Sequence, residues 1–198
     1  MPKLAAAARA ERKQRFIAAA WRCVAQMGYR DMTVDEICAE AGQSKGAFYI
    51  YFPHKQSLLL ALLDDDASHL DRLIAELDQH GSSSVDRLRR FTQAALQRNE
   101  HPGRAQVRAD LWSGMLTEPE VRAGVAASVE RRRGPLRRWV EEGVANGELI
   151  DIPANALASI LLALTDGLIL HAALDPNGFR WPRIARALDL VLEGLTQG

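Results

Sequence analysis

Between Thr33 and Lys55 the chain carries side chains of the kinds that recognise nucleic acids. Glutamine pairs with adenine, lysine donates to guanine, and an alanine methyl packs against thymine. Gln43, Lys45 and Ala47 supply these three groups at the expected start of a short helix. We therefore expect these residues to meet base edges.

Other residues nearby are suited to phosphates, whose contacts position a protein on DNA without reading its sequence. These side chains are Thr33, Ser44, Tyr49, Tyr51, His54 and Lys55. The backbone N–H groups of Lys45 and Gly46 stand at a helix N-terminus, where a phosphate is favoured. For Tyr51, packing into the core is an equal alternative.

Local chemistry predicts two short helices that would position these groups. Thr33 with Glu36 three residues later forms a capping box, and Gly42 stands where a left-handed residue closes a helix. The apolar face of the first helix is made by Val34, Ile37, Cys38 and Ala41. Ser44 caps the second helix, which carries Phe48 inward. Two helices joined by a tight turn are typical of a helix-turn-helix, whose second helix enters the DNA major groove.

On these residues the chain resembles the TetR (tetracycline-repressor) family of bacterial transcription regulators, over roughly Phe16 to Leu63. The matching positions are Thr33-Val34, Glu36-Ile37, Ala41-Gly42, Ser44-Lys45-Gly46, Phe48-Tyr49, Tyr51-Phe52, Lys55 and Leu58-Leu59. Gln43 departs from the valine usual in the family, and Pro53 from its commoner choices. The resemblance implies an all-α fold of about nine helices, with a three-helix head on a helical body. It also implies a DNA-binding repressor that a small molecule releases from its operator.

Helical spacing of apolar residues accounts for the rest of the chain. The expected helices run from Arg9 to Met27, His54 to His80, Val85 to Asn99, Arg104 to Met115, about 118 to 146, Pro153 to Leu174 and Trp181 to about Thr196. No segment shows sustained strand alternation. We therefore divide the chain into a helix-turn-helix DNA-binding domain, residues 1–53, and a helical effector-binding and dimerisation domain, residues 54–198.

Charge is distributed unevenly along the chain, although the formal net charge is zero. Residues 1–55 hold nine Lys and Arg against five Asp and Glu, and residues 56–198 hold 16 against 20. A basic head on an acidic body suits a protein that touches DNA with one end only. No uninterrupted apolar run reaches the ~18 residues of a membrane span, and Arg9 interrupts the N-terminus too early for a signal peptide. The composition indicates a soluble, cytoplasmic protein.

Two apolar stripes in the last two expected helices predict a homodimer. The stripes are Leu157, Leu161, Leu164 and Leu168, and Ile184, Leu188, Val191 and Leu195. Two helices from each chain would form a four-helix interface. The alternative is that the stripes close the core of the chain itself. A two-fold dimer would place its heads about 34–36 Å apart or more, so the operator would be roughly palindromic.

The family resemblance places an effector pocket inside the body, among the long fourth helix and those after it. In this chain that region contains Phe91, Arg108, Leu111, Trp112, Met115, Asp166 and Leu170. Asp166 interrupts an apolar run, where a carboxylate is costly to bury unless it is paired. Its alternative roles are a structural pair with an arginine or exposure to water at a dimer edge. Such a pocket would suit an unidentified, medium-sized, largely apolar ligand with one polar or cationic group.

An enzyme is the competing class of function. Gly42 to Gly46 spells G-x-S-x-G, the nucleophile elbow of hydrolases, but that motif needs a strand before the serine and here a helix precedes Ser44. The five histidines match no catalytic motif, and the cysteines and histidines show no metal-ligand spacing. We therefore expect no catalytic residue, no metal and no cofactor.

A regulator without a small ligand remains a further alternative. Cys23 and Cys38 are expected to be buried as small apolar residues. Both fall in the expected DNA-binding head, so control by thiol oxidation is an alternative, as is control by a protein partner. The Asp64-Asp65-Asp66 run and the arginine clusters at 131–133 and 137–138 are expected to be solvated helix faces. Glu130, Glu141 and Glu142 stand at helical spacing from those arginines.

Overall fold

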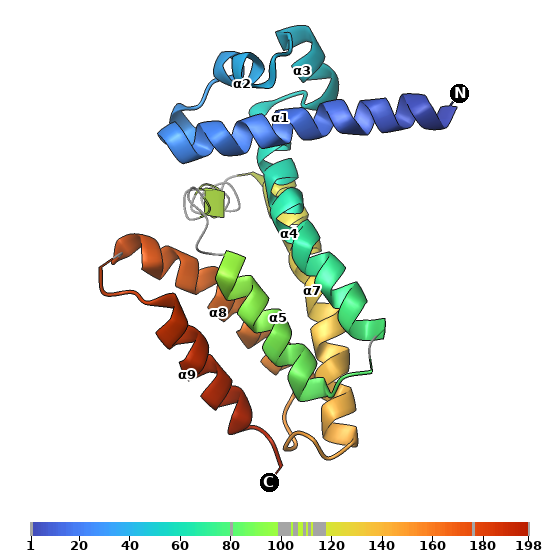
Figure 1. The fold of residues 1–198 in the computed structure, drawn as a ribbon, viewed down its shortest axis with the longest axis vertical. Coiled ribbons are helices and arrows are strands. Elements are labelled where there is room, and N and C mark those ends of the chain that lie inside the picture. Colours follow the sequence, from blue (N-terminus) through green and yellow to red (C-terminus); the bar gives the residue numbers. More distant parts are fainter. Residues whose placement is uncertain are drawn as a thin grey trace. The chain divides into compact units, whose positions relative to one another are not determined.

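The computed structural model describes residues 2–79, 81–98, 104, 107–108, 110, 112, 118–175 and 177–197. Its helices are α1 (Pro2–Asp31), α2 (Val34–Ala41), α3 (Lys45–Tyr51), α4 (Lys55–Gln79), α5 (Ser84–Arg98), α7 (Pro119–Ala145), α8 (Ala154–Leu174) and α9 (Trp181–Glu193) (Figure 1). Within the described ranges, β structure is limited to one isolated bridge between Leu149 and Thr196. The predicted all-α fold is confirmed.

Several helix boundaries differ from the predicted ones; α9, for example, ends at Glu193 rather than near Thr196. The helix expected from Arg104 to Met115 lies largely outside the described residues, although residues 104, 107, 108, 110 and 112 are helical. Helix α1 begins at Pro2 rather than Arg9, because the alanines between them have the highest helix propensity. Gly28, the predicted stop, has φ 81° and ψ 163°, so it kinks the chain before a last helical stretch that ends at Asp31.

The chain forms two compact units. The first is Met1–Asp66 with Pro102–Val125, and the second is Ala67–His101 with Ala126–Gly198. These bounds differ from the predicted division after residue 53, because the first half of α4 packs into the core of the first unit. The leucines responsible are Leu58, Leu59, Leu62 and Leu63.

Phe16 of α1 lies at the centre of the first core. Its ring centroid is 5.5 Å from that of Phe48 in α3, with the rings edge to face, and 6.3 Å from that of Phe52. Ile37 of α2 is fully buried in the same cluster. This packing fixes α3 against α1 (Figure 1), so the other side of α3 is left to solvent.

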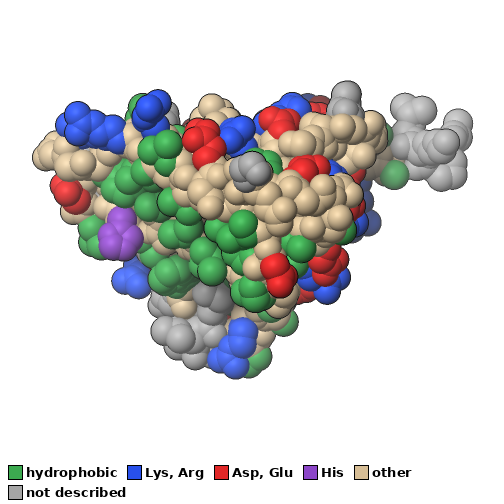
Figure 2. Space-filling view, turned by 90° about the horizontal axis from the view of Figure 1, so that it is seen from below, with side chains coloured by type: hydrophobic (Ala, Val, Ile, Leu, Met, Phe, Trp, Pro, Cys, Tyr) green, Lys and Arg blue, Asp and Glu red, His purple; other side chains and the backbone are tan. Residues whose placement is uncertain are grey.

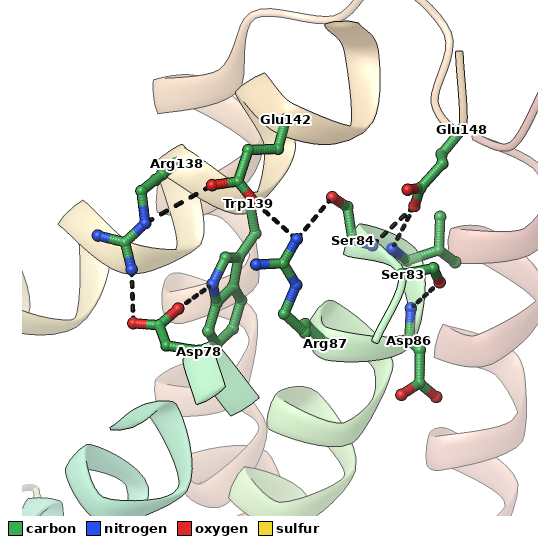
Figure 3. Close-up of polar contacts among 10 residues, drawn as sticks. Asp78, Ser83, Ser84, Asp86, Arg87, Arg138, Trp139, Glu142 and Glu148 are labelled. Carbon is green, nitrogen blue, oxygen red and sulfur yellow. Dashed lines mark hydrogen bonds and ion pairs between the residues drawn. The ribbon is translucent and has the colours of Figure 1, made fainter. Parts of the chain in front are cut away.

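Trp139 of α7 is fully buried in the second unit, together with Leu88 and Phe91 of α5. Its indole Nε1 donates to Oδ1 of Asp78 at 2.7 Å, and Arg138 donates to the other carboxylate oxygen at 2.6 Å (Figure 3). Partial burial alone would raise the pKa of Asp78, but these two hydrogen bonds outweigh it and lower the pKa below its ordinary value. The carboxylate at the end of α4 therefore joins α4 to α7.

The start of α5 is held by neighbouring polar contacts (Figure 3). Oε2 of Glu148 accepts the backbone N–H groups of Ser84 at 2.7 Å and Val85 at 3.4 Å. A carboxylate is stabilising at a helix N-terminus, where these N–H groups have no partner in the helix. Arg87 donates to Glu142 of α7 at 2.6 Å. The first turn of α5 is thus fixed to α7 and to the segment after it.

The Asp64-Asp65-Asp66 run matches the expected solvated face only at Asp64, which is exposed; Asp65 is half-buried. Asp66 is buried and pairs with Arg104 and with Arg108, the latter at 3.3 Å. Asp65 accepts from the indole of Trp21 at 2.9 Å. Burial lowers the pKa of Arg104 to about 10. A buried charge is tolerated only when it is paired. Asp66 is buried because two arginines about 40 residues later in the sequence pair with it.

The arginine clusters of α7 largely match the expected solvated face. The predicted acid partners are confirmed: Arg133 pairs with Glu130, Arg137 with Glu141 and Arg138 with Glu142. Arg132 is the exception, because it is buried and donates to the carbonyl oxygen of Ser128 at 3.2 Å.

Helix α8 is long and apolar enough over Ala154–Ala172 to cross a membrane by length and composition alone, although we expected no such segment. About a third of the stretch, 33%, is buried in the structure. Leu157, Ala158 and Leu161 contribute to the second core. A core helix of a globular domain has the same composition, and packing explains this part of its apolar character.

Candidate nucleic-acid interface

The start of α2 is fixed by the predicted capping box. Oε2 of Glu36 accepts from the backbone N–H and the hydroxyl of Thr33 at 2.7 and 2.8 Å, and Glu36 N–H donates back to Oγ1 at 3.3 Å. These hydrogen bonds from Thr33 lower the pKa of Glu36. The hydroxyl of Thr33, which we expected to meet a phosphate, is therefore engaged within the protein.

The turn between α2 and α3 has the predicted left-handed glycine. Gly42 has φ 62° and ψ 38° and donates its N–H to Ala39 at 3.2 Å, while Gln43 N–H donates to the Cys38 carbonyl at 3.0 Å. Oγ of Ser44 then accepts the N–H of Ala47 at 3.2 Å and caps α3. Ser44 follows a helix and turn rather than a strand, which removes the structural basis of the hydrolase motif.

Helix α3 presents one open face. Lys45 and Gly46 are exposed, and Tyr49 and Ile50 are 51% and 67% exposed, whereas Phe48 is buried. Nζ of Lys45 forms an ion pair at 2.6 Å with Asp35 of α2.

Ile50 was missing from the sequence-based set of contact residues. Gln43, in the turn before α3, and Ala47 of α3 are half-buried. Ile50 follows Ala47 by three residues, so these two share one side of the helix. That spacing was visible in the sequence.

Tyr51 and His54 make contacts within the first unit. The Tyr51 ring is half-buried, 6.0 Å from the Phe16 ring, which agrees with the alternative of core packing. Nδ1 of His54 accepts the N–H of Ser57 at 3.2 Å, and its Nε2 lies 3.8 Å from Glu120. Contact of either residue with a phosphate stays a prediction.

Lys55 binds the end of α1. Its Nζ donates to the carbonyl oxygen of Arg30 at 3.0 Å and lies 4.5 Å from the centre of the Tyr29 ring. The Tyr29 hydroxyl donates back to the Lys55 carbonyl at 2.8 Å. Burial lowers the pKa of Lys55 and raises that of Tyr29. Lys55 therefore has a structural role that its position in the motif did not reveal.

Helices α2 and α3 are both capped, are joined by a turn at Gly42, and leave one face of α3 open. Comparisons with known proteins agree with this geometry. Residues 16–62 match the family described as bacterial regulatory proteins, tetR family. Residues 84–197 match the C-terminal region of BetI-type transcriptional repressors. The chain belongs to the TetR family of bacterial regulatory proteins. It is a DNA-binding transcription regulator and not an enzyme.

Similar TetR-family proteins span nearly the whole chain. The transcriptional repressor AcnR of Corynebacterium glutamicum is 27% identical over 180 residues, 90% of this chain and 89% of AcnR. The transcriptional regulator AcuR of Cereibacter sphaeroides is 34% identical over 170 residues, 82% of this chain and 76% of AcuR. A regulator of Saccharomonospora viridis, solved in complex with choline, has a TM-score of 0.79 at 24% identity and covers 96% of this chain and 100% of that one. This last likeness shows the fold.

The seven residues predicted to bind an effector are divided between the two units. Leu111 and Met115 lie outside the described residues. Arg108 is paired with Asp66 in the first unit, where Trp112 is exposed. In the second unit Phe91 is fully buried, whereas Asp166 and Leu170 are half-buried. Their grouping around one ligand remains a prediction.

The second unit contains a cavity of about 380 Å³ between α5 and α9. It is lined by Gln93, Leu96, Gln97, Trp181, Pro182 and Ala185, none of which was in the predicted effector set. Nε2 of Gln93 donates to both carboxylate oxygens of Asp189 at 3.0 and 3.2 Å, so its amide is held in place. The Phe179 ring packs edge-on against Trp181 at 4.8 Å between centroids. The volume is within the range of small-molecule sites.

The predicted dimer stripes lie partly inside the core of the chain itself. Leu157, Leu161 and Leu188 are buried, and Leu168, Ile184 and Leu195 pack against the same core. The large apolar residues that α8 and α9 leave exposed are Ile160, Leu164, Leu174, Leu190 and Val191. Figure 2 shows apolar side chains gathered across one face of the molecule. Only Leu164 and Val191 of the predicted set are open to a partner in the way we expected.

Cys23 and Cys38 are free and buried in the first unit, as expected. Burial raises the pKa of both thiols, which disfavours the reactive thiolate. Among the described residues, no group of three or more His, Cys, Asp and Glu is placed to hold a metal ion.

Proposed function

We propose that this TetR-family regulator is a cytoplasmic homodimeric repressor that binds a roughly palindromic operator and leaves it when a small molecule binds its body. The open face of α3 carries this proposal. The helix is seven residues long, is capped by Ser44, and carries a cation at Lys45 and apolar groups at Ala47 and Ile50. The turn just before it adds an amide at Gln43. Those groups complement base edges in the major groove.

The direct test is binding to the DNA upstream of the protein's own gene, measured by gel shift against a random duplex of equal length. Gln43→Ala should relax the preference at one or two base pairs, by roughly 5- to 100-fold, because a bidentate contact to a base is lost. Tyr49→Phe is the control: it removes a hydroxyl suited to a phosphate, so it should leave the base preference unchanged. Equal binding of wild type to both duplexes would refute the repressor proposal.

Repression and release by a small molecule are supported by relatives rather than by any bound ligand. The AcnR relative is named a repressor. The Saccharomonospora viridis structure holds choline, and FadR of Bacillus subtilis, with a TM-score of 0.78 at 17% identity, holds stearoyl-CoA. Choline is the first probe, since a quaternary ammonium binds over aromatic faces such as that of Trp181.

Tryptophan fluorescence during choline titration can locate the effector. Trp181→Phe should abolish the signal if the ligand enters the cavity between α5 and α9. Trp112→Phe should abolish it if the ligand enters the predicted site. Operator release is then measured in the two variants and in Asp166→Asn. An inducer whose potency none of the three changes would refute both locations and leave DNA binding intact.

A further inference from the structure

Helix α1 extends well before the segment that matches the family. The match begins at residue 16, whereas α1 begins at Pro2. We call residues 2–15 the N-terminal arm; at 1.5 Å per residue it spans about 21 Å. The arm holds five Lys and Arg and one acid, Glu11, which pairs with Arg15 at 2.8 Å. By sequence the arm therefore has a formal net charge of +4.

The arm is a helix exposed to solvent. Residues 6–15 are all exposed, so burial of apolar surface does not maintain their conformation. Five of the residues from 5 to 10 are alanines, the best helix formers, and they suit a helix without tertiary support. In an exposed helix whose cationic residues stand among small alanines, a negatively charged partner can approach the backbone closely.

The cations of the arm lie beside the recognition helix. The Arg9 guanidinium carbon is 6.0 Å from the centre of the Tyr51 ring, and Lys13 Nζ is 5.9 Å from that of Phe52. Arg9 and Lys13 are four residues apart, and Phe16 continues the same side of α1 into the core. Their face of α1 is therefore the one turned toward α3. Unlike Lys45, neither cation forms an ion pair with a carboxylate in the described part of the chain.

We propose that the arm is a second DNA contact, in which Arg9, Arg12 and Lys13 bind backbone phosphates that flank the base pairs facing α3. This inference rests on the proposed DNA-binding function. Arg12 and Lys13 stand three and four residues after Arg9, so both lie next to Arg9 on the surface of the helix and the three cations form one cluster. Phosphate contacts add affinity that falls with salt and carry no base preference.

DNA fits the arm better than a membrane surface does. A helix that lies on a membrane needs a broad apolar face of large residues opposite its cations. The arm offers alanines and a single leucine, Leu4. Its cluster instead adjoins the C-terminal end of α3, where the phosphates next to a bound major groove would lie.

The test compares two double variants that each remove two cations from the first unit. Arg9→Ala/Lys13→Ala removes the proposed phosphate contacts. Arg15→Ala/Arg22→Ala removes two arginines that pair with Glu11 and Glu40. The full-length variants are titrated with a random-sequence duplex and with the upstream duplex at several salt concentrations. Far-UV circular dichroism checks folding, which alanine at a helix position favours.

The arm variant should flatten the slope of log affinity against log salt by about 1.8, because each phosphate contact contributes about 0.9. Its affinity should fall about tenfold on both duplexes, with their ratio unchanged. The control variant should stay within about 0.5 of the wild-type slope. Hydroxyl-radical footprinting should show protection lost only at the outer edges of each half-site.

An unchanged slope in the arm variant, or an equal loss in the control, would overturn the proposal while DNA binding by α3 stands. A wild-type protein that binds neither duplex would overturn the proposed function and the arm contact together. If wild type bound only the random duplex, the upstream DNA would not be the operator. The slope of log affinity against log salt on the random duplex would still test the arm contact.

Discussion

Nζ of Lys45 lies 2.6 Å from Oδ1 of Asp35, which joins the first residue of the recognition helix to the first turn of α2. Both side chains are more than half exposed, so solvent screens the pair and its contribution is small. The lysine that we expect to meet a base edge is therefore held by an acid in the free protein, and DNA must displace that acid.

Asp35→Asn should tighten binding to any duplex by roughly two- to fivefold, because Lys45 is released and a negative charge beside the phosphates is lost. Gel shifts at low and high salt measure the effect, which should shrink as salt rises. Glu40→Gln is the matched control, since Glu40 pairs with Arg22 of α1. Weaker binding by Asp35→Asn would show that the acid positions Lys45 rather than competing for it.

Arginine at two positions of α9 should have opposite consequences. Val191 is 60% exposed, so Val191→Arg should give a folded monomer. Leu188 is 8% exposed in the second core, and Leu188→Arg should lower the free energy of unfolding by more than about 3 kcal/mol, because it buries a charge. Sedimentation velocity and urea unfolding separate the two effects. If Val191→Arg still forms a dimer at micromolar concentration, the dimer interface does not include this part of α9.

The Asp78 carboxylate should make stability depend on pH on the acid side. The pKa of Asp78 is lower in the folded state than its ordinary value of 3.8. Its contribution to the free energy of unfolding is therefore fully present above pH 3.8 and is lost as the pH falls through the pKa of the folded state. Asp78→Asn should cost about 1 kcal/mol at neutral pH, after allowance for partial exposure. The gap between wild type and variant should close below pH 3.8. Urea unfolding of wild type and Asp78→Asn across this pH range measures the gap.

Two glycines of the second unit should respond to alanine with opposite signs. A Cβ at Gly143 would lie 2.8 Å from Cδ1 of Leu149 and 3.0 Å from Cβ of Ser84, both buried, so Gly143→Ala should destabilise by about 1–3 kcal/mol. A Cβ at Gly167 meets nothing within 4 Å in the described structure. Gly167→Ala should therefore stabilise by about 0.5–1 kcal/mol, since it removes glycine from a helix interior. Urea midpoints measure both, and equal signs would contradict the packing described for Gly143.

The sequence by itself determined the local structure around the recognition helix. The capping box of Thr33 and Glu36, the left-handed Gly42 and the cap at Ser44 all involve residues within a few positions of one another. Such interactions depend on the local chain alone, so residue type and spacing were enough to place α2 and α3. The same is true of Phe48, whose inward position follows from the helical period.

Only the tertiary structure decided which side of an apolar helix is covered and which charges find partners. Helix α8 is apolar on several sides, so its pattern could not show that Leu161 faces the core while Leu164 stays open. Nor could spacing show that Lys55 would bind the Arg30 carbonyl or that Asp66 would be buried beside Arg104. Each of these outcomes depends on groups 25 or more residues away in sequence that packing brings within a few ångströms.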